Sequence, residues 1–304
     1  MNKNNNKQIN LTKIEQSGQI FNLSILCILL FSVLTSLVVN LIAKGAGKSV
    51  EEVTSSGLYI AFSYAFSSLA FIVSIVVFCK KNNTKITSVF ECEKPTKISV
   101  ISTLLIAFAM LFGLSFINEF IVQIVGKLGI EITSPKMPEF SIINFVLIVI
   151  FVCILPPIFE EVIFRNIIYK NLSNYGTIMA ILLSALVFSL YHMSLSQTVY
   201  QFIVGVLFAL IIYGGGNYIL TAFCHFINNL FIVLNYYFFN INFDKTTNTI
   251  FTILGLISLV VGVVLLLYKS KNFIKAQKGS AIKFLLYAFL GLMICILFWV
   301  VNLL

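Results

Sequence analysis

Residues 142–165, IINFVLIVIFVCILPPIFEEVIFR, form an apolar run that ends in two glutamates and an arginine. The run is long enough to cross a bilayer, because a spanning helix needs about 20 mostly apolar residues. The whole chain of 304 residues is also apolar in character, with 59% hydrophobic and 10% charged residues and a mean hydropathy of +1.01. Soluble domains carry about 25% charged residues, so a water-soluble protein is excluded. A disordered chain is excluded too, because such chains have little apolar surface to bury.

Further apolar runs flank this stretch, and together they give about nine candidate transmembrane segments. Their Val, Ile, Leu and Phe residues show no strand-like alternation, so helices are favoured over a β-barrel. The chain is therefore predicted to be an all-α polytopic membrane protein, with eight spans if the sixth run does not fully cross. The runs lie at about residues 20–43, 57–79, 99–126, 142–164, 176–194, 199–214, 217–239, 249–268 and 281–303.

Basic residues predict the orientation. With a cytoplasmic N-terminus and nine alternating spans, about three quarters of the 20 Lys and Arg residues lie inside, in line with the positive-inside rule. The net charge of +9 is therefore attributed to topology, and nucleic acid is not an expected partner. The expected organisation is a polar N-terminus (1–19), N-terminal helices (20–130), a core (140–240) and C-terminal helices (249–304). The six cysteines form no CxxC pair and are interpreted as small hydrophobic residues.

The charged end of the 142–165 stretch predicts a polar pocket within the membrane. Pro156 and Pro157 remove backbone donors just before the acidic pair, and irregular backbone at this depth must lie against protein or water. Glu161 and Arg165 are four residues apart, so they can pair on one helix face. Glu160 points about 100° away and is free to act as a general base. The alternative is a purely structural Glu–Arg bridge between helices.

Both histidines of the chain lie in apolar runs, where an ionisable residue is by default a functional candidate. Phe188 and His192 are spaced so that the phenyl ring can pack on the imidazole. His225 and Asn229 share a helix face and carry N–H donors, which suits them to hold an oxyanion. Taken singly, each group could instead be a polar contact between helices. Glu119 has no partner at a helical spacing and is interpreted as structural.

The motifs Glu-Glu-x-x-x-Arg, Phe-x-x-x-His and His-x-x-x-Asn follow one another on three successive hydrophobic blocks. This order resembles the CPBP (CAAX protease and bacteriocin-processing, or Abi) family of intramembrane endopeptidases, which includes the type II CAAX prenyl endopeptidases. The resemblance covers about residues 140–240, and no motif residue departs from the pattern. The motif residues are Glu160, Glu161, Arg165, Phe188, His192, His225 and Asn229.

The resemblance implies a protease, that is, a hydrolase with a polar cavity and a water nucleophile. The roles it implies are water activation by Glu160 assisted by His192, an oxyanion site from His225 and Asn229, and support of the first carboxylate by Glu161 and Arg165. Two histidines and a glutamate can also ligate zinc, with Glu160, His192 and His225 as the ligands. The chain has no His-Glu-x-x-His helix, so a mechanism without a cofactor is favoured and zinc is the alternative.

The expected substrate is a hydrophobic, lipidated or membrane-associated peptide or protein. Because the Lys, Asn and Ile content is typical of an AT-rich bacterium, we expect a multi-pass protein of the bacterial plasma membrane and favour a short peptide precursor, as in bacteriocin maturation. Two other functions stay open: a non-proteolytic bacteriocin-immunity or scaffold protein of the same fold, and a carrier with Glu160 and His192 as a proton relay.

The expected site sets one geometric condition. His192 lies about 24 Å along its helix if that helix begins near residue 176, whereas His225 lies about 12 Å along its own helix. For the two imidazoles to meet, the fifth helix must tilt or must start below the membrane surface.

Overall fold

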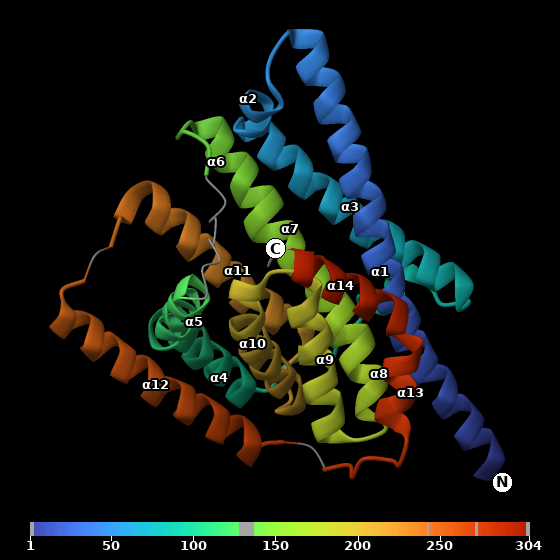
Figure 1. The fold of residues 1–304 in the computed structure, drawn as a ribbon. Helices are drawn as coiled ribbons and strands as arrows, with labels where there is room; N and C mark the ends of the chain where they lie inside the picture. Colours follow the sequence, from blue (N-terminus) through green and yellow to red (C-terminus); the bar gives the residue numbers. More distant parts are fainter. Residues whose placement is uncertain (1–2, 128–136, 242, 271–272, 302–304) are drawn as a thin grey trace.

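The computed structural model describes residues 3–127, 137–241, 243–270 and 273–301, and every regular element in these ranges is helical (Figure 1). The α-helices are α1 (Lys3–Ala46), α2 (Val50–Thr54), α3 (Gly57–Lys81), α4 (Lys97–Phe108), α5 (Ser115–Lys127), α6 (Ile142–Ile148), α7 (Leu155–Glu161), α8 (Lys170–Ser173), α9 (Thr177–Tyr191), α10 (Leu195–Tyr213), α11 (Tyr218–Leu234), α12 (Lys245–Tyr268), α13 (Ser280–Tyr287) and α14 (Phe289–Val301). The 3-10 helix η1 (Ile86–Val89) and the π-helical segments η2 (Ala109–Gly113), η3 (Val149–Ile154), η4 (Val162–Tyr169) and η5 (Asn235–Phe239) complete the chain order. The predicted all-α polytopic membrane architecture is confirmed.

The number of helices that can cross a bilayer is below the predicted nine, and its upper value equals the predicted alternative of eight. Within the described ranges, 7 helical segments are long and apolar enough, or 8 if α13 and α14, which meet at 68°, count as one span. Within the described residues all nine predicted runs are mainly helical, but α9 has only 15 residues, or about 22 Å at 1.5 Å per residue. The helix ends there because Met193 takes a left-handed conformation with φ 49°. The run predicted to fall short, 199–214, instead forms the 19-residue α10, which is long enough to span.

Helices α9, α10 and α11 form the middle of the bundle, with α7 packed against α11 (Figure 1). On one flank α1 packs against α3, α13 and α14, and on the opposite flank α12 packs against α4. Many Leu, Ile and Val side chains of α1 and α12 are exposed, as expected for helices that face lipid. The polar residues of the central helices are thus enclosed by apolar ones.

Small residues hold α12 against the core. A Cβ atom added to Gly113 would lie 2.7 Å from the backbone carbonyl carbon of Gly255, so the two backbones touch at a point where no side chain fits. Ser258 of α12 also donates a hydrogen bond of 2.9 Å to the Leu105 carbonyl of α4. The helix that carries the outer apolar face is therefore fixed at a defined depth.

The stretch from α6 to α8 is one long helix whose winding changes four times. It passes from α6 into the π-helical η3, returns to α-helix at α7 with Pro156 and Pro157 in its first turn, widens again in η4 and returns to α-helix at α8. Such π-helical turns often occur at functional sites. Pro156 and Pro157, which were predicted to interrupt the helix, lie at the change from η3 to α7, and Glu160 and Glu161 lie in the last turn of α7.

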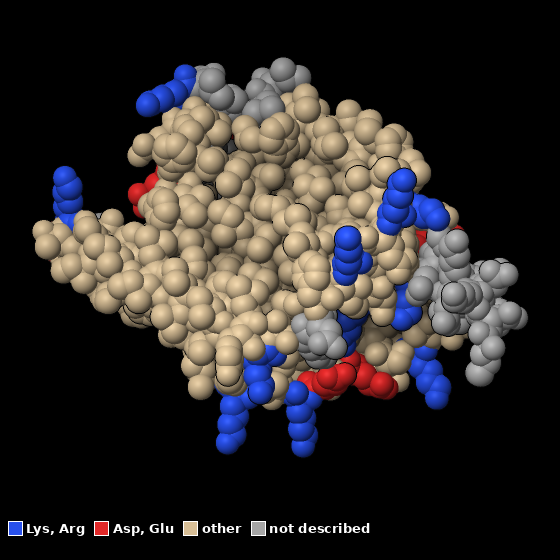
Figure 2. Space-filling view, turned by 90° about the horizontal axis from the view of Figure 1, so that it is seen from below, with Lys and Arg blue, Asp and Glu red and all other residues tan. Residues whose placement is uncertain are grey.

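Most of the face seen in Figure 2 is formed by uncharged residues, and lysines project mainly from its rim, with a few nearer its middle. A surface that is mostly uncharged is expected of a chain that spans a bilayer. All six cysteines are free thiols, and each is buried except Cys92, which is partly exposed. Their interpretation as small hydrophobic residues agrees with this burial.

Candidate active site

An ion pair between Glu161 and Arg165 lies in the centre of the bundle. The distance from Arg165 Nε to Glu161 Oε2 is 3.1 Å, and both side chains are 0% exposed. Glu161 ends α7 and Arg165 belongs to the π-helical η4, so the pairing expected from the spacing of four residues is present despite the wider winding. Separating such a buried pair leaves a charge without compensation, which is costly.

Aromatic rings complete the environment of Arg165. Its Cζ atom lies 4.4 Å from the ring centroid of Phe188 on α9 and 5.4 Å from that of Phe208 on α10. Within the described ranges the two terminal guanidinium nitrogens have no hydrogen-bond partner, so Glu161 and the ring faces hold the charge. A desolvated cation–π contact contributes about 2 kcal/mol, and the arginine thereby connects α7, α9 and α10.

Glu160 carries a second buried carboxyl group beside this pair. Its side chain is 6% exposed, and its Oε2 atom has no hydrogen-bond partner among the residues that the structure describes. The carboxyl group interacts electrostatically with His225 and with the Glu161–Arg165 pair, and these three residues also carry buried polar atoms without a hydrogen-bonding partner in the same part of the chain. Buried polar groups of this kind normally bind water or a ligand. Glu160 therefore faces the polar centre of the site.

His192 caps the C-terminus of the short helix α9. Its Nδ1 atom lies 2.8 Å from the Phe188 carbonyl oxygen. Because a carbonyl only accepts hydrogen bonds, Nδ1 carries the hydrogen, and Nε2 of the neutral imidazole is an acceptor. The expected packing on Phe188 is present, with ring centroids 5.0 Å apart and an interplanar angle of 78°. The geometry leaves Nε2 available to accept a proton or to orient a water molecule.

His225 of α11 reaches the same aromatic ring. Its centroid lies 6.1 Å from that of Phe188 and 5.9 Å from that of Phe208. Its Nδ1 atom lies 3.7 Å from Glu161 Oε1, which is beyond a hydrogen bond but close enough for electrostatic attraction. Both imidazoles thus border the Phe188 ring.

Asn229 supplies a hydrogen-bond donor that the two prolines of α7 lack. Its Nδ2 atom donates a hydrogen bond of 3.2 Å to the Val152 carbonyl. That carbonyl would normally bind the N–H of residue 156 in an α-helix or of residue 157 in a π-helix, and both positions are proline, which has no N–H. The amide therefore ties α11 to the segment that carries Glu160. The amide nitrogen bears a second N–H, which can serve an oxyanion.

Several residues near the site were not predicted. The hydroxyl of Tyr200 lies 3.4 Å from Asn228 Oδ1, and Asn228 Nδ2 lies 3.5 Å from Asn229 Oδ1, so a polar chain extends from α10 to Asn229 of α11. Asn228 could have been found from the sequence, because it is a polar residue in an apolar run and directly precedes Asn229. Phe208 had none, because it is one of 30 phenylalanines. Glu119 is exposed on α5 and lies apart from these contacts.

The zinc alternative can be tested against the donor set. A zinc site needs at least three ligand atoms that converge at about 2.0–2.3 Å from the ion. In the described part of the chain, no three His, Cys, Asp or Glu side chains are grouped in a way that could hold a metal ion. The side chains of Glu160, His192 and His225 therefore do not fit a zinc ion in this arrangement.

Comparison with known families agrees with this geometry. Residues 142–231 match the family model described as type II CAAX prenyl endopeptidase Rce1-like. Comparisons with curated proteins and with solved structures give no match. The matched segment runs from α6 into α11 and contains every residue of the three motifs. Over residues 142–231, about 30% of its length, the chain is therefore similar to the CAAX protease (CPBP) family.

Proposed function

We propose that this protein is an intramembrane endopeptidase that hydrolyses a peptide bond in a hydrophobic, lipidated or membrane-associated peptide or protein. The observation that carries the proposal is the buried carboxyl group of Glu160, whose Oε2 atom has no hydrogen-bond partner within the described ranges. Beside it, the charge of Glu161 is compensated by Arg165 at 3.1 Å. One carboxylate is thus committed to an ion pair, while its neighbour is free to exchange a proton.

In the proposed reaction Glu160 accepts a proton from a water molecule as the water oxygen attacks the scissile carbonyl carbon. The Nε2 acceptor of His192 orients the same water. A C–O bond forms, the carbonyl π electrons move to the oxygen, and the resulting oxyanion accepts hydrogen bonds from His225 and Asn229. The oxyanion then collapses, the C–N bond breaks, and Glu160 returns its proton to the leaving amine.

The ion pair has a supporting role in this mechanism. Arg165 compensates the charge of Glu161 at 3.1 Å, and Glu161 Oε1 lies 3.7 Å from His225 Nδ1, so the ion pair positions this imidazole. An imidazole N–H can donate a hydrogen bond, which the proposed oxyanion role of His225 requires. We propose a short peptide precursor in a bacterial plasma membrane as the substrate.

The experiment compares full-length wild type and Glu160→Gln in detergent, with a library of quenched hydrophobic peptides. Because the amide keeps the shape but cannot take up the proton, cleavage should fall by about 10²–10⁴-fold, the usual contribution of a general base. Glu119→Gln is the matched control, since Glu119 is exposed on α5 and should keep full activity. Equal unfolding midpoints of the three proteins would show that the loss is chemical.

Wild-type rates from Glu160→Gln would refute the proposal. Cleavage that a strong chelator abolishes and that zinc restores would refute the metal-free mechanism and leave the site in place. If neither protein cleaves any peptide, bacteriocin protection of cells that express each form decides the matter: equal protection by Glu160→Gln assigns the chain to the non-proteolytic immunity function.

A further inference from the structure

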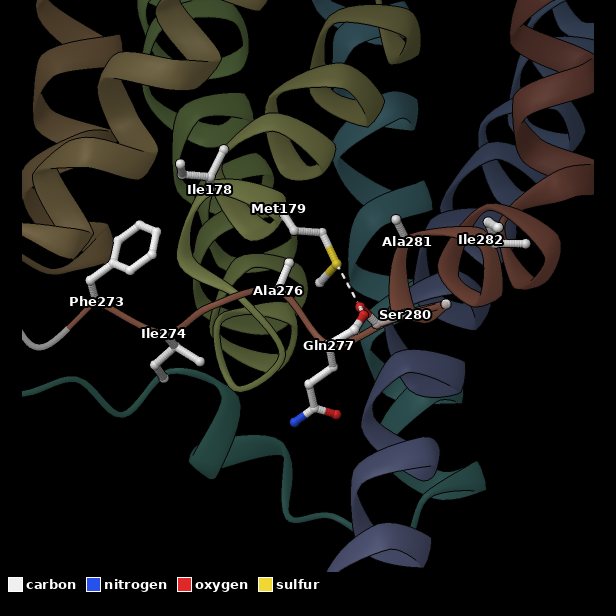
Figure 3. Close-up of a pocket in the computed structure, with 10 residues that line it drawn as sticks. Ile178, Met179, Phe273, Ile274, Ala276, Gln277, Ser280, Ala281 and Ile282 are labelled. Carbon is white, nitrogen blue, oxygen red and sulfur yellow. Dashed lines mark hydrogen bonds between the residues drawn. The ribbon is translucent and has the colours of Figure 1, made fainter.

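A pocket of about 480 Å³ lies away from the catalytic residues, between the start of α9 and the segment that leads into α13 (Figure 3). Ile178 and Met179 of α9 form one side, and Phe273, Ile274 and Ala276 of the segment form the other. The walls are largely apolar, and Ser280 at the start of α13 donates to the Met179 sulfur at 3.0 Å (Figure 3). Large apolar side chains at the mouth are exposed, with Ile178 at 55% and Phe273 at 61%.

The segment beside this pocket is basic. Between residues 273 and 283 the sequence has three lysines and no acidic residue. Lys275 and Lys278 alternate with residues that line the pocket, and both are exposed. A lysine carries its charge on a flexible four-carbon stem, so these ammonium groups can reach the mouth. Clusters of Lys at the cytoplasmic end of membrane helices attract anionic lipids.

The pocket is also tied to the helix that ends in His192. The Thr177 N–H donates to the Ile274 carbonyl at 2.9 Å, and the Gln277 N–H donates to the Tyr175 carbonyl at 2.8 Å. A Cβ atom added to Gly176 would lie 2.7 Å from Ala276 Cα, so the two backbones are in contact. A molecule that orders this segment therefore also supports the start of α9.

We propose that this pocket binds an anionic phospholipid of the bilayer. Its acyl chain lies along the apolar wall formed by Ile178 and Phe273, and its phosphate pairs with Lys275 and Lys278. Apolar walls and two positive charges at one mouth match the two halves of such a lipid. The site is independent of the peptidase proposal, because none of its residues belongs to the catalytic group.

The test is native mass spectrometry of the full-length protein, released from mild detergent after titration with dioleoylphosphatidylglycerol or dioleoylphosphatidylcholine. The anionic lipid should bind more tightly by tenfold or more. Each lysine at an anionic lipid surface contributes about fivefold in affinity, so the double variant Lys275→Gln/Lys278→Gln should bind phosphatidylglycerol about 30-fold more weakly. Lys80→Gln/Lys81→Gln, which removes two exposed charges at the end of α3, is the matched control and should bind like wild type.

A second variant tests the apolar wall. Ile178→Trp adds bulk at the mouth, on a side chain already exposed, and should reduce binding of phosphatidylglycerol without altering the unfolding midpoint. Equal affinity for the two lipids, or equal losses in the two lysine double variants, would overturn the proposal. Competition by inorganic phosphate at the lipid concentration would overturn it too, since it would show a site for free anions.

Discussion

Replacing Arg165 tests whether the buried ion pair holds the catalytic centre together. Arg165→Met preserves most of the length of the side chain but removes its charge. The fully buried Glu161 carboxylate then lacks its partner at 3.1 Å. Loss of one member of a buried pair costs about 3–5 kcal/mol, and the lost contacts to the Phe188 and Phe208 rings add to this. We therefore expect the free energy of unfolding to fall by about 4 kcal/mol, or roughly 10³-fold in the unfolding equilibrium.

The double variant Glu161→Leu/Arg165→Met separates charge from packing. Replacing both members of a buried pair by apolar groups of similar volume is often neutral or stabilising, so the double variant should be more stable than Arg165→Met by about 3 kcal/mol. The measurement is the free energy of unfolding from titration with sodium dodecyl sulfate in mixed micelles, arranged as a double-mutant cycle. Lys85→Met, at an exposed position, is the control and should change the free energy by less than about 0.5 kcal/mol.

Two results would refute the reasoning. A cost below about 1 kcal/mol for Arg165→Met would mean that water or movement compensates Glu161. A double variant as unstable as the single one would mean that Arg165 acts through packing on the rings and not through its charge.

Three further predictions concern contacts between helices and the N-terminal cap of α12. Asn229→Leu leaves the Val152 carbonyl unpaired, so the free energy of unfolding should fall by about 1–3 kcal/mol in the same titration. An unchanged free energy would contradict a stabilising role of this hydrogen bond. Gly255→Ala should lower the unfolding midpoint because its Cβ would meet the Gly113 backbone, whereas Gly126→Ala, with nothing within 4 Å, should not. The Asp244 carboxylate caps α12 and accepts bonds from Thr246 and Thr247, and these bonds lower its pKa below the usual range. Because its pKa is lower when folded than when unfolded, the cap stabilises above the ordinary carboxyl pKa of about 3.9 and is lost as the pH falls below it. Hydrogen exchange at the Thr247 amide should therefore accelerate at low pH relative to Asp244→Asn, and equal pH profiles would contradict the capping.

The contacts that the sequence predicts correctly lie within single helices. Glu161 pairs with Arg165 and Phe188 packs on His192 because residues four apart are neighbours on any helix surface, whatever surrounds it. The helical nature of the nine apolar runs follows from composition alone, since backbone groups in lipid must bond within their own segment. Local geometry and the bilayer thus determine which residues are available for a site.

The tertiary structure decides which of these residues meet. His192 and His225 share the Phe188 ring only because α9 stops at Tyr191 and because α9 and α11 both pack against α10. The sequence periodicity of a single helix does not encode this arrangement. The stacking of Phe208 on Arg165 and the bond from Asn229 to Val152 likewise join segments far apart in the chain. Contacts between helices depend on crossing angles and depth, which are set by the packing of whole surfaces. The sequence therefore determines the chemistry that is possible, and the packing of the helices determines where it is assembled.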